Sequence, residues 1–383
     1  MSSNYPNGFA NGITIRGVNL TTTNPGEVFW VNNGALAKNG VGGSNGNNGS
    51  YRRPFATVDY AVSKCTASRG DIVFVMPNHN EGGVAAGLFD IDIAGVAVVG
   101  LGYKGNRPTF DFDDTDVTVV ISAANCTLAN VNLRSSAGDV VTGISVTAKN
   151  ARIDNCEFLN EAATDNFIDF IETSAVANAC DGLSVTNCRV YSTDTGNNSF
   201  IELNKAITGL ELIGNEITLG IGAGESVIGF DTATDVALNV TITDNVINRL
   251  ITDGPILIEG TANTLTGVVA RNLIGHVDAA APVLIPTGSL IRHFENYAAG
   301  AIDVNGRLWP AVESTSDMRL KSNIIKIGKY LGYNIYTWTW NATANALGIN
   351  DPTVGVMAQE VMHTGCVRER DGWLRVNYGK LFA

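Results

Sequence analysis

The chain has 383 residues, of which 45% are hydrophobic, 16% are charged and 42 are glycine, and its formal net charge is −12. This composition allows a large buried core, and the many glycines favour one long repetitive domain over several ordinary ones. The negative charge argues against sequence-independent binding of nucleic acid, which needs Lys and Arg to neutralise phosphates, and against binding to a membrane surface. The N-terminus lacks the pattern of a signal peptide, and no apolar run is long enough for membrane insertion, so we expect synthesis in a cytoplasm.

The first fifty residues contain a stretch rich in Gly and Asn. Residues 39–49, NGVGGSNGNNG, include nine Gly or Asn among eleven residues, which predicts a flexible link. The preceding part carries the apolar stretch VFWVNN at 28–33. Two interpretations of this part stay open: a segment that attaches the chain to a larger particle, or a frayed terminus.

A short helix is expected next, in RRPFATVDYAVSKCTASRGDIVFVMP (52–77). Phe55, Val58, Val62 and Cys65 are spaced three, four and three residues apart and form one apolar stripe of a helix. Pro54 lies where a proline is tolerated in the first turn. Residues 71–75, DIVFV, are expected to begin the sheet, so the helix would cap the N-terminal end of a β-structure.

Seven hexads with one shared pattern follow. Each has an apolar first residue, a small or polar third residue and an apolar sixth residue, and their fourth residues are 30, 25, 32, 27, 30 and 27 positions apart. The hexads are VVGLGY (98–103), LANVNL (128–133), IDNCEF (153–158), VTNCRV (185–190), LIGNEI (212–217), ITDNVI (242–247) and VARNLI (269–274). Such regular spacing is typical of a repeat architecture.

The repeats predict an all-β fold. Apolar residues two positions apart, in short runs broken by Gly, Asn, Asp and Thr, are typical of strands with tight corners. No segment between the hexads has the pattern of a crossover helix, so successive strands must be joined by turns and further strands. This favours a parallel β-solenoid, in which equivalent residues of successive turns stack about 4.8 Å apart.

The fourth residue of each hexad suggests a ladder of stacked side chains. Asn215, Asn245 and Asn272 occupy this position, and Asn296 in HFENYA follows 24 residues later. Buried amides need partners, and stacked asparagines can bond to the turns on either side. The alternative interpretation is that this row of asparagines binds a ligand.

The cysteines and histidines give no sign of a metal or cofactor site. Six cysteines lie too far apart for a C-x-x-C site, and the four histidines lack the spacing of metal ligands. Cys156 and Cys188 share the fourth position one turn apart, a separation compatible with a disulfide. Synthesis in a cytoplasm nevertheless favours free thiols. We expect no cofactor and no metal.

The composition changes near residue 316. From Ser316 to Ala383 there are eight Lys or Arg and five Asp or Glu, a net charge of +3, which leaves −15 for the residues before. This change marks a domain boundary. Four motifs follow in order: SDMRLKSNI (316–324), YNIYTWTW (333–340), GVMAQEV (355–361) and WLRVNYGKL (373–381).

Two resemblances follow from these motifs. The stretch GNNGSYRRPFATVDYAV…RGDIVFVMP, with the repeats up to about residue 300, resembles the pectate-lyase-like right-handed parallel β-helices of phage tailspikes. The C-terminal motifs resemble the intramolecular chaperone domain of phage endosialidases, a small α+β domain. The resemblances divide the chain into an N-terminal attachment segment and link (1–50), a β-helix with a helical cap (51–300), a linker (301–315) and a chaperone-like domain (316–383).

The second resemblance implies a self-cleavage site. Members of that family hold three chains together during assembly, and many then cut themselves before the motif serine. Carried over, Ser316 is the nucleophile, Lys321 is its general base, and Asp317 and Arg319 orient the pair. The alternative is structural: Ser316 or Asp317 caps a helix, and Arg319 and Lys321 are solvated.

Two functions are therefore expected from different classes. The first is a structural phage virion protein: a homotrimeric spike or fibre on the virion surface, attached to capsid or tail proteins through its N-terminal segment. The second is a tailspike depolymerase that binds and cleaves a host surface glycan, which needs two suitably spaced carboxylates. The acidic stretches FDFDDTD (110–116) and DNFIDFIE (165–172) are the best candidates for those carboxylates.

Overall fold

The computed structural model describes most of the chain, which divides into two compact units. The described residues are 13–15, 18–20, 26–33, 42–83, 87–162, 164–221, 226–230, 236–250, 264–276, 290–300, 306–308, 313–349 and 353–381. The first unit comprises Met1–His293 and Ala299–Asp303, and the second comprises Phe294–Ala298 and Val304–Ala383. Among the helices described, none has the length and apolar character needed to cross a membrane.

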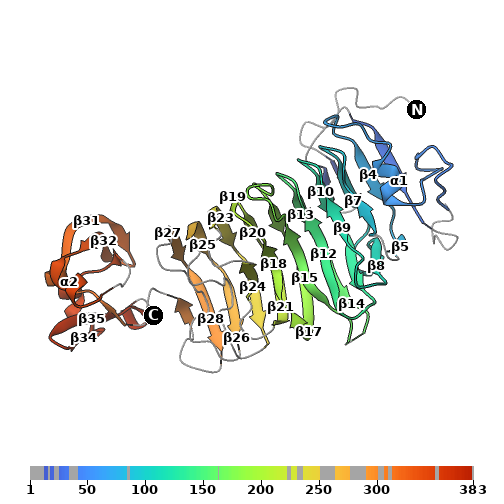
Figure 1. Cartoon of the computed structure of the whole chain (residues 1–383). Coiled ribbons are helices and arrows are strands. Elements are labelled where there is room, and N and C mark those ends of the chain that lie inside the picture. Colours follow the sequence, from blue (N-terminus) through green and yellow to red (C-terminus); the bar gives the residue numbers. More distant parts are fainter. Residues whose placement is uncertain are drawn as a thin grey trace. The chain divides into compact units, whose positions relative to one another are not determined.

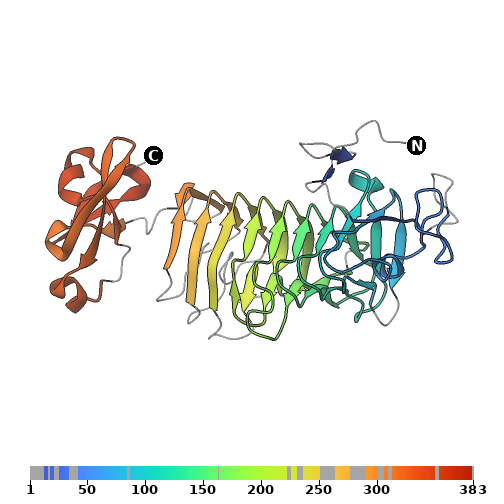
Figure 2. The same ribbon diagram turned by 90° about the horizontal axis from the view of Figure 1, so that it is seen from above.

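The first unit is a parallel β-solenoid, as the sequence predicts (Figures 1 and 2). Its strands form three sheets in which each strand pairs with the equivalent strand of the next turn. The first sheet consists of β3 (Val28–Val31), β4 (Ile72–Val75), β7 (Ala97–Gly100), β10 (Thr127–Ala129), β13 (Arg152–Asp154), β16 (Ser184–Thr186), β20 (Glu211–Ile213), β23 (Val236–Thr243), β25 (Thr264–Ala270) and β27 (Leu290–Phe294), with β19 (Ile207–Thr208) beside β23.

The other two sheets complete each turn. The second sheet includes β5 (Asn80–Gly83), β8 (Thr109–Phe112), β11 (Asn132–Ser135), β14 (Glu157–Asn160), β17 (Arg189–Asn197), β21 (Glu216–Ile221), β24 (Val246–Arg249) and β26 (Leu273–His276). The third consists of β6 (Phe89–Asp90), β9 (Val119–Ile121), β12 (Val140–Val146), β15 (Phe167–Thr173), β18 (Ser199–Leu203) and β22 (Ile228–Phe230). A separate hairpin, β1 (Ile13–Ile15) and β2 (Val18–Leu20), precedes them.

The hexads lie in register along the solenoid. Their first residues are paired from turn to turn in the first sheet, in the order Val98, Leu128, Ile153, Val185, Leu212, Ile242 and Val269. Their sixth residues are paired in the second sheet from Leu133 onward. The first hexad differs, because Phe110 and not Tyr103 pairs with Leu133. The short 3-10 helix η1 (Lys104–Asn106) inserts residues between them.

A left-handed bend separates the first and second sheets within each hexad. The third residue has a positive φ in most turns: Asn130, Asn155, Asn187, Gly214, Asp244 and Arg271, with φ between 54° and 70°. Asn, Asp and Gly adopt this conformation at the lowest cost. A second column of left-handed residues lies five positions earlier in five of these turns, at Asn125, Asn150, Gly182, Gly209 and Asn239. In four of these turns the two columns bracket the short strands β10, β13, β16 and β20 of the first sheet.

Aromatic side chains fill the interior of the solenoid. Phe112 and Phe158 both contact Phe167, with ring centroids 5.0 and 5.8 Å apart. Phe170 contacts Phe158 and Phe200 in the same way, at 5.4 and 6.3 Å. All five side chains are essentially inaccessible to solvent. Mostly tilted and edge-to-face contacts of this kind favour one packing arrangement in addition to burying apolar area.

The N-terminal end of the solenoid differs from the prediction in two ways. Helix α1 (Val58–Val62) is shorter than the stripe from Phe55 to Cys65, because Thr57 caps it and Phe55 forms a bridge with Val31. In addition, β3 pairs in parallel with β4, so the first sheet begins at Val28. The boundary placed at residue 50 is therefore too late for residues 28–31, which belong to the solenoid. Residues 1–12 and 34–41 lie outside the described residues.

The second unit is a small α+β domain. By their pairing, β28 (Asn296–Gly300) and β29 (Gly306–Leu308) continue the second sheet of the solenoid next to β26. Two antiparallel three-stranded sheets follow them in the chain. The first contains β30 (Glu313–Thr315), β35 (Trp373–Asn377) and β34 (Val367–Arg370); the second contains β31 (Lys321–Tyr330), β32 (Tyr333–Trp340) and β33 (Val354–Gly355). The helical segments are η2 (Met318–Leu320), α2 (Ala342–Ala346), α3 (Ala358–Val361), η3 (Met362–Thr364) and α4 (Tyr378–Leu381).

The predicted linker 301–315 overlaps this domain. Residues 313–315 form β30 and pair with β35, so the domain begins before Ser316. Residues 301–305 and 309–312 lie outside the described residues.

The stacked asparagines give the first testable prediction. Asn245 is buried, and its amide donates to the Leu212 carbonyl and to Asn272. We expect Asn245→Ala to lower the free energy of unfolding by about 3 kcal/mol, because buried donors and acceptors lose their partners. Chemical denaturation measures this change. Asn248→Ala, on the same turn but with one part-buried bond to Thr218, is the control. Equal effects of the two variants would contradict a stabilising ladder.

Candidate functional site

Ser316 and Lys321 lie together inside the C-terminal domain. Ser316 directly follows β30 and Lys321 begins β31, and the single turn of η2 lies between them. The Lys321 Nζ atom donates to Ser316 Oγ at 3.0 Å. Ser316 is fully buried and Lys321 is 6% exposed. The structural alternative of a solvated Lys321 therefore does not hold.

The backbone and hydroxyl of Ser316 are held by three distant segments. Its N–H donates to the Leu374 carbonyl at 3.0 Å, and its carbonyl accepts from the N–H of Ala358 at 2.9 Å. Its Oγ donates to the Val356 carbonyl at 2.5 Å and lies 3.2 Å from the Tyr378 hydroxyl. The serine is thus fixed in one orientation.

The ammonium group of Lys321 lies among tryptophan rings, a backbone carbonyl and a methionine sulfur. Its Nζ lies 3.3 Å from the centroid of the Trp338 ring and 6.0 Å from that of Trp340. It is also 3.5 Å from the Val356 carbonyl oxygen and 3.6 Å from the Met357 sulfur. The aromatic residues of YNIYTWTW therefore help to position the lysine. Once it has lost its proton, an amine at this distance can accept the proton of the serine hydroxyl.

Asp317 anchors the turn that brings Ser316 and Lys321 together. Its buried carboxylate accepts from the backbone and side chain of Arg319, from the Gln359 amide at 2.7 Å and from the Leu374 N–H at 3.1 Å. Burial alone raises the pKa of Asp317, but these donors, Arg319 first, lower it to about 2. Asp317 also caps η2, as the structural alternative expects.

Arg319 acts through Asp317. Its guanidinium lies 2.6 Å from the Asp317 carboxylate and stacks on Trp373, 4.9 Å from the ring centroid. Its side chain is 60% exposed. In the contacts described, Asp317 and Arg319 shape the turn between Ser316 and Lys321.

The fourth residues of the hexads form a buried column. The Asn215 amide donates to Asn245 at 2.9 Å, and the Asn245 amide donates to Asn272 at the same distance. Each amide also reaches a backbone carbonyl two turns away from its acceptor, and the Asn215 oxygen accepts from the Cys188 N–H. Asn296 is buried and begins β28, the strand next to β26 in the second sheet. These contacts are internal, so the described ladder offers no amide to a ligand.

The six cysteines are free thiols. Cys156 and Cys188 occupy the same column in the two turns that precede Asn215, and both are buried. Burial, reinforced by Cys156, raises the pKa of Cys188 well above its ordinary value. Burial also raises the pKa of Cys65 to about 12. Such thiols are poor nucleophiles and metal ligands, because the thiolate is the reactive form.

Carboxylates in both acidic stretches take part in polar contacts between neighbouring turns. Asp111 forms a two-pronged ion pair with Arg134. In the second stretch, the two Glu172 oxygens accept from Thr142 and Asn204, each at 2.7 Å. Within the described ranges, no group of three or more His, Cys, Asp or Glu residues is arranged to hold a metal ion.

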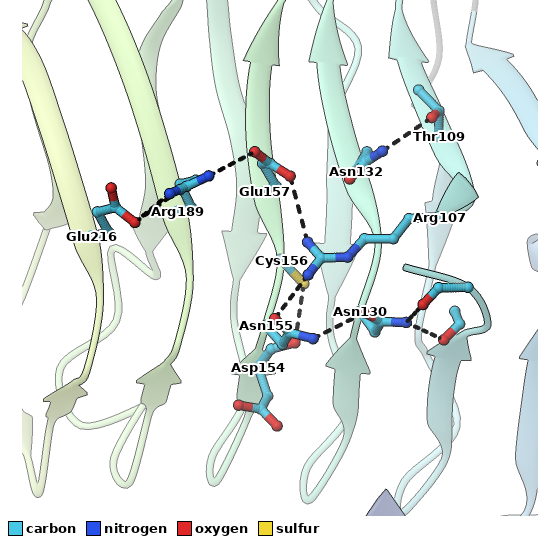
Figure 3. A network of polar contacts seen from close by, with 12 residues as sticks. Arg107, Thr109, Asn130, Asn132, Asp154, Asn155, Cys156, Glu157, Arg189 and Glu216 are labelled. Atoms are coloured by element: carbon cyan, nitrogen blue, oxygen red, sulfur yellow. Dashed lines mark hydrogen bonds and ion pairs between the residues drawn. The ribbon is translucent and has the colours of Figure 1, made fainter. Parts of the chain in front are cut away.

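A polar network on the second sheet was not found from the sequence (Figure 3). The Glu157 carboxylate lies between Arg107, at 3.6 Å, and Arg189, at 4.0 Å, and Arg189 continues to Glu216 at 2.6 Å. Arg107 also donates to the bend residue Asn155 at 2.9 Å. Glu157, Arg189 and Glu216 are paired from strand to strand, so the register of the hexads could have revealed this row.

Comparison with known proteins identifies the C-terminal domain. Residues 316–364 match the family model described as chaperone of endosialidase. The resemblance to a phage spike with a β-helix and a C-terminal chaperone domain is thereby confirmed. This combination is typical of phage tail fibre and tailspike-like proteins.

The chain was also compared with solved structures and with curated proteins. A solved structure of a rhamnogalacturonan lyase has 15% sequence identity to this chain, with a TM-score of 0.42 over 70% of this chain and 87% of the lyase chain. No curated protein matches the sequence.

The pKa of Asp317 gives a second prediction. Its folded-state pKa of about 2 is below the ordinary value of 3.8, so the carboxylate stabilises the domain above pH 3.8. This stabilisation, about 2 kcal/mol, is lost as the pH falls towards 2. We expect Asp317→Asn to be less stable than the wild type at pH 5, with a difference that shrinks towards pH 2. Tryptophan fluorescence during unfolding measures it.

The exposed Asp371 provides the control for this prediction. Its side chain is 80% exposed beside Arg370. Asp371→Asn should leave the dependence of stability on pH unchanged, because an exposed ion pair contributes little. If Asp317→Asn behaves in the same way, the carboxylate does not anchor the turn.

Proposed function

We propose that the chain is a structural subunit of a phage virion, a homotrimeric β-helical spike or fibre whose C-terminal domain is an intramolecular chaperone. The observation that carries this proposal is one chain combining a parallel β-solenoid with a segment that matches the chaperone-of-endosialidase family. The proposed position is the virion surface, on head or tail. Residues that precede β3 would bind capsid or tail proteins, and a host surface glycan would be a further partner.

Exposed apolar residues in the C-terminal domain support its proposed role in trimerisation. Strand β31 lies at the edge of its sheet, and Ile325 and Ile327 on it are 60% and 56% exposed. Leu331, in the turn after β31, is 63% exposed. Contacts between three copies would bury these side chains and cover the strand edge.

The solenoid has a physical need for such help. Each strand pairs with a strand about one turn away in the sequence, for example Leu128 with Ile153 and Val185 with Leu212. Non-local parallel pairing forms slowly and leaves strand edges exposed to aggregation. A compact domain that associates first would hold three chains in register while the turns form.

Deletion of the domain tests the proposal. We expect the full chain of 40.4 kDa to form a trimer, and a chain that ends at residue 312 to be insoluble or monomeric although the solenoid strands remain. Light scattering and soluble yield measure the outcome. A soluble trimer of the shortened chain with normal yield would refute the chaperone role and would favour a permanent tip domain.

We also propose that the domain cuts its own chain once, between Thr315 and Ser316. The 3.0 Å contact between Lys321 and Ser316, both buried, supports this step. Lys321 accepts the Ser316 hydroxyl proton while Oγ attacks the Thr315 carbonyl carbon, and the proton passes to the Ser316 nitrogen as the C–N bond breaks. Water then hydrolyses the resulting ester to a Thr315 carboxylate and the Ser316 hydroxyl.

Intact-mass analysis tests the cleavage. The wild type should yield one fragment that ends at Thr315 and one that starts at Ser316, and Ser316→Ala and Lys321→Ala should remain full length. Ser314→Ala and Lys326→Ala are matched controls that should cleave, because neither residue contacts the pair in the bonds described. A wild type that stays intact after folding would reduce the pair to a structural contact.

A further inference from the structure

The hydrogen bonds around Ser316 Oγ account for each proton in turn. Its own proton is donated to the Val356 carbonyl at 2.5 Å, and Lys321 Nζ donates to it at 3.0 Å. The Tyr378 hydroxyl oxygen accepts from the Val356 N–H at 3.2 Å. Because the serine proton is directed to Val356, we assign the Tyr378 hydroxyl as the donor in its 3.2 Å contact with Ser316 Oγ.

The fold keeps the Tyr378 hydroxyl in this place. The ring is 2% exposed and packs in a cluster with Val356, Ala358 and Val376. Tyr378 begins α4, immediately after β35, whose residue Leu374 accepts from the Ser316 N–H. A Cβ atom at Gly355 would lie 2.1 Å from the Tyr378 hydroxyl oxygen, so the glycine leaves the space that this oxygen occupies.

We propose that Tyr378 is a third catalytic residue of the self-cleavage. This inference rests on the cleavage proposed above between Thr315 and Ser316. As Oγ transfers its proton to Lys321, negative charge develops on this oxygen inside a buried site. Lys321 accepts the proton in this step, so the Tyr378 hydroxyl is the donor that the described contacts direct at Oγ. A fixed donor aimed at developing charge lowers the barrier more than it stabilises the resting state.

Tyr378 keeps its own proton throughout the step. Its hydroxyl shortens its hydrogen bond to Oγ as the charge grows and relaxes when the Oγ–carbon bond to Thr315 has formed. Lys321 remains the group that takes the proton and returns it to the Ser316 nitrogen. The residue therefore adds stabilisation of the alkoxide without changing the balance of the reaction.

The test compares the rate of cleavage in Tyr378→Phe with that in the wild type. Full-length chains made by cell-free translation are followed by intact mass as the fragments form. We expect Tyr378→Phe to slow the first-order rate by about 10²-fold, by analogy with the loss of one donor from an oxyanion hole. Tyr336→Phe is the matched control, because that hydroxyl bonds to Glu360 in the same domain; it should cleave at the wild-type rate.

A second variant separates a chemical role from a structural one. Replacement of Tyr378 by 3-fluorotyrosine keeps the ring and the hydroxyl, but the hydroxyl is more acidic. If it donates to the developing alkoxide, the pH dependence of the cleavage rate shifts to lower pH, whereas a purely structural hydroxyl leaves the profile unchanged. This variant decides the question if Tyr378→Phe does not fold.

The outcomes distinguish the two proposals. If the wild type cleaves and Tyr378→Phe folds and cleaves at the same rate, Tyr378 is not catalytic while the Ser316 and Lys321 pair stands. An unchanged pH profile with 3-fluorotyrosine leads to the same conclusion. If the wild type does not cleave, both the self-cleavage and the role of Tyr378 are wrong.

Discussion

The left-handed bend at the third position of six of the seven hexads is the constraint on which the solenoid depends. It turns the chain from the first sheet into the second, and its N–H donates to the carbonyl just before the bend of the next turn, as from Asn130 to Asp154 and from Asn187 to Ile213. Five of these six bends use Asn, Asp or Gly, which adopt positive φ at low cost, and Arg271 is the exception. With other residues at all the bends, the cost would recur along the whole length. Regular corners then keep the strands in register.

The buried column of asparagines beside the bend shows how polar side chains can be accommodated inside a solenoid. A single buried amide would leave donors and acceptors unpaired, but consecutive amides satisfy one another. The series ends at Asn215, whose oxygen accepts from the backbone N–H of Cys188. The turns before it therefore need no amide, and the column continues with Cys156 and Cys188 as small apolar residues. The change from amide to thiol follows from this hydrogen-bond pattern.

The sequence predicts the repeat and its register well, because apolar positions recur at the same place in each hexad. It names Ser316 and Lys321 only through the resemblance of SDMRLKSNI to a family motif, and their separation of five residues makes their contact a local one. It does not predict Val356 or Tyr378, which reach Ser316 only after two sheets and α4 have assembled. The sequence also does not predict the bounds of α1, because the spacing of Phe55 and Val58 fits a helix although Phe55 forms a β-bridge with Val31.

Because β30 is paired within the C-terminal domain, cleavage of the chain and dissociation of its two parts would be separate steps. Glu313, Ser314 and Thr315 are paired with Asn377, Val376 and Arg375 inside an antiparallel sheet. A cut after Thr315 would leave this strand hydrogen-bonded to the domain from which it had been severed. Cleavage would then permit dissociation of the domain without causing it. The peptide bond would be broken, but the hydrogen bonds of the three-residue strand β30 would still have to break before the two parts could separate.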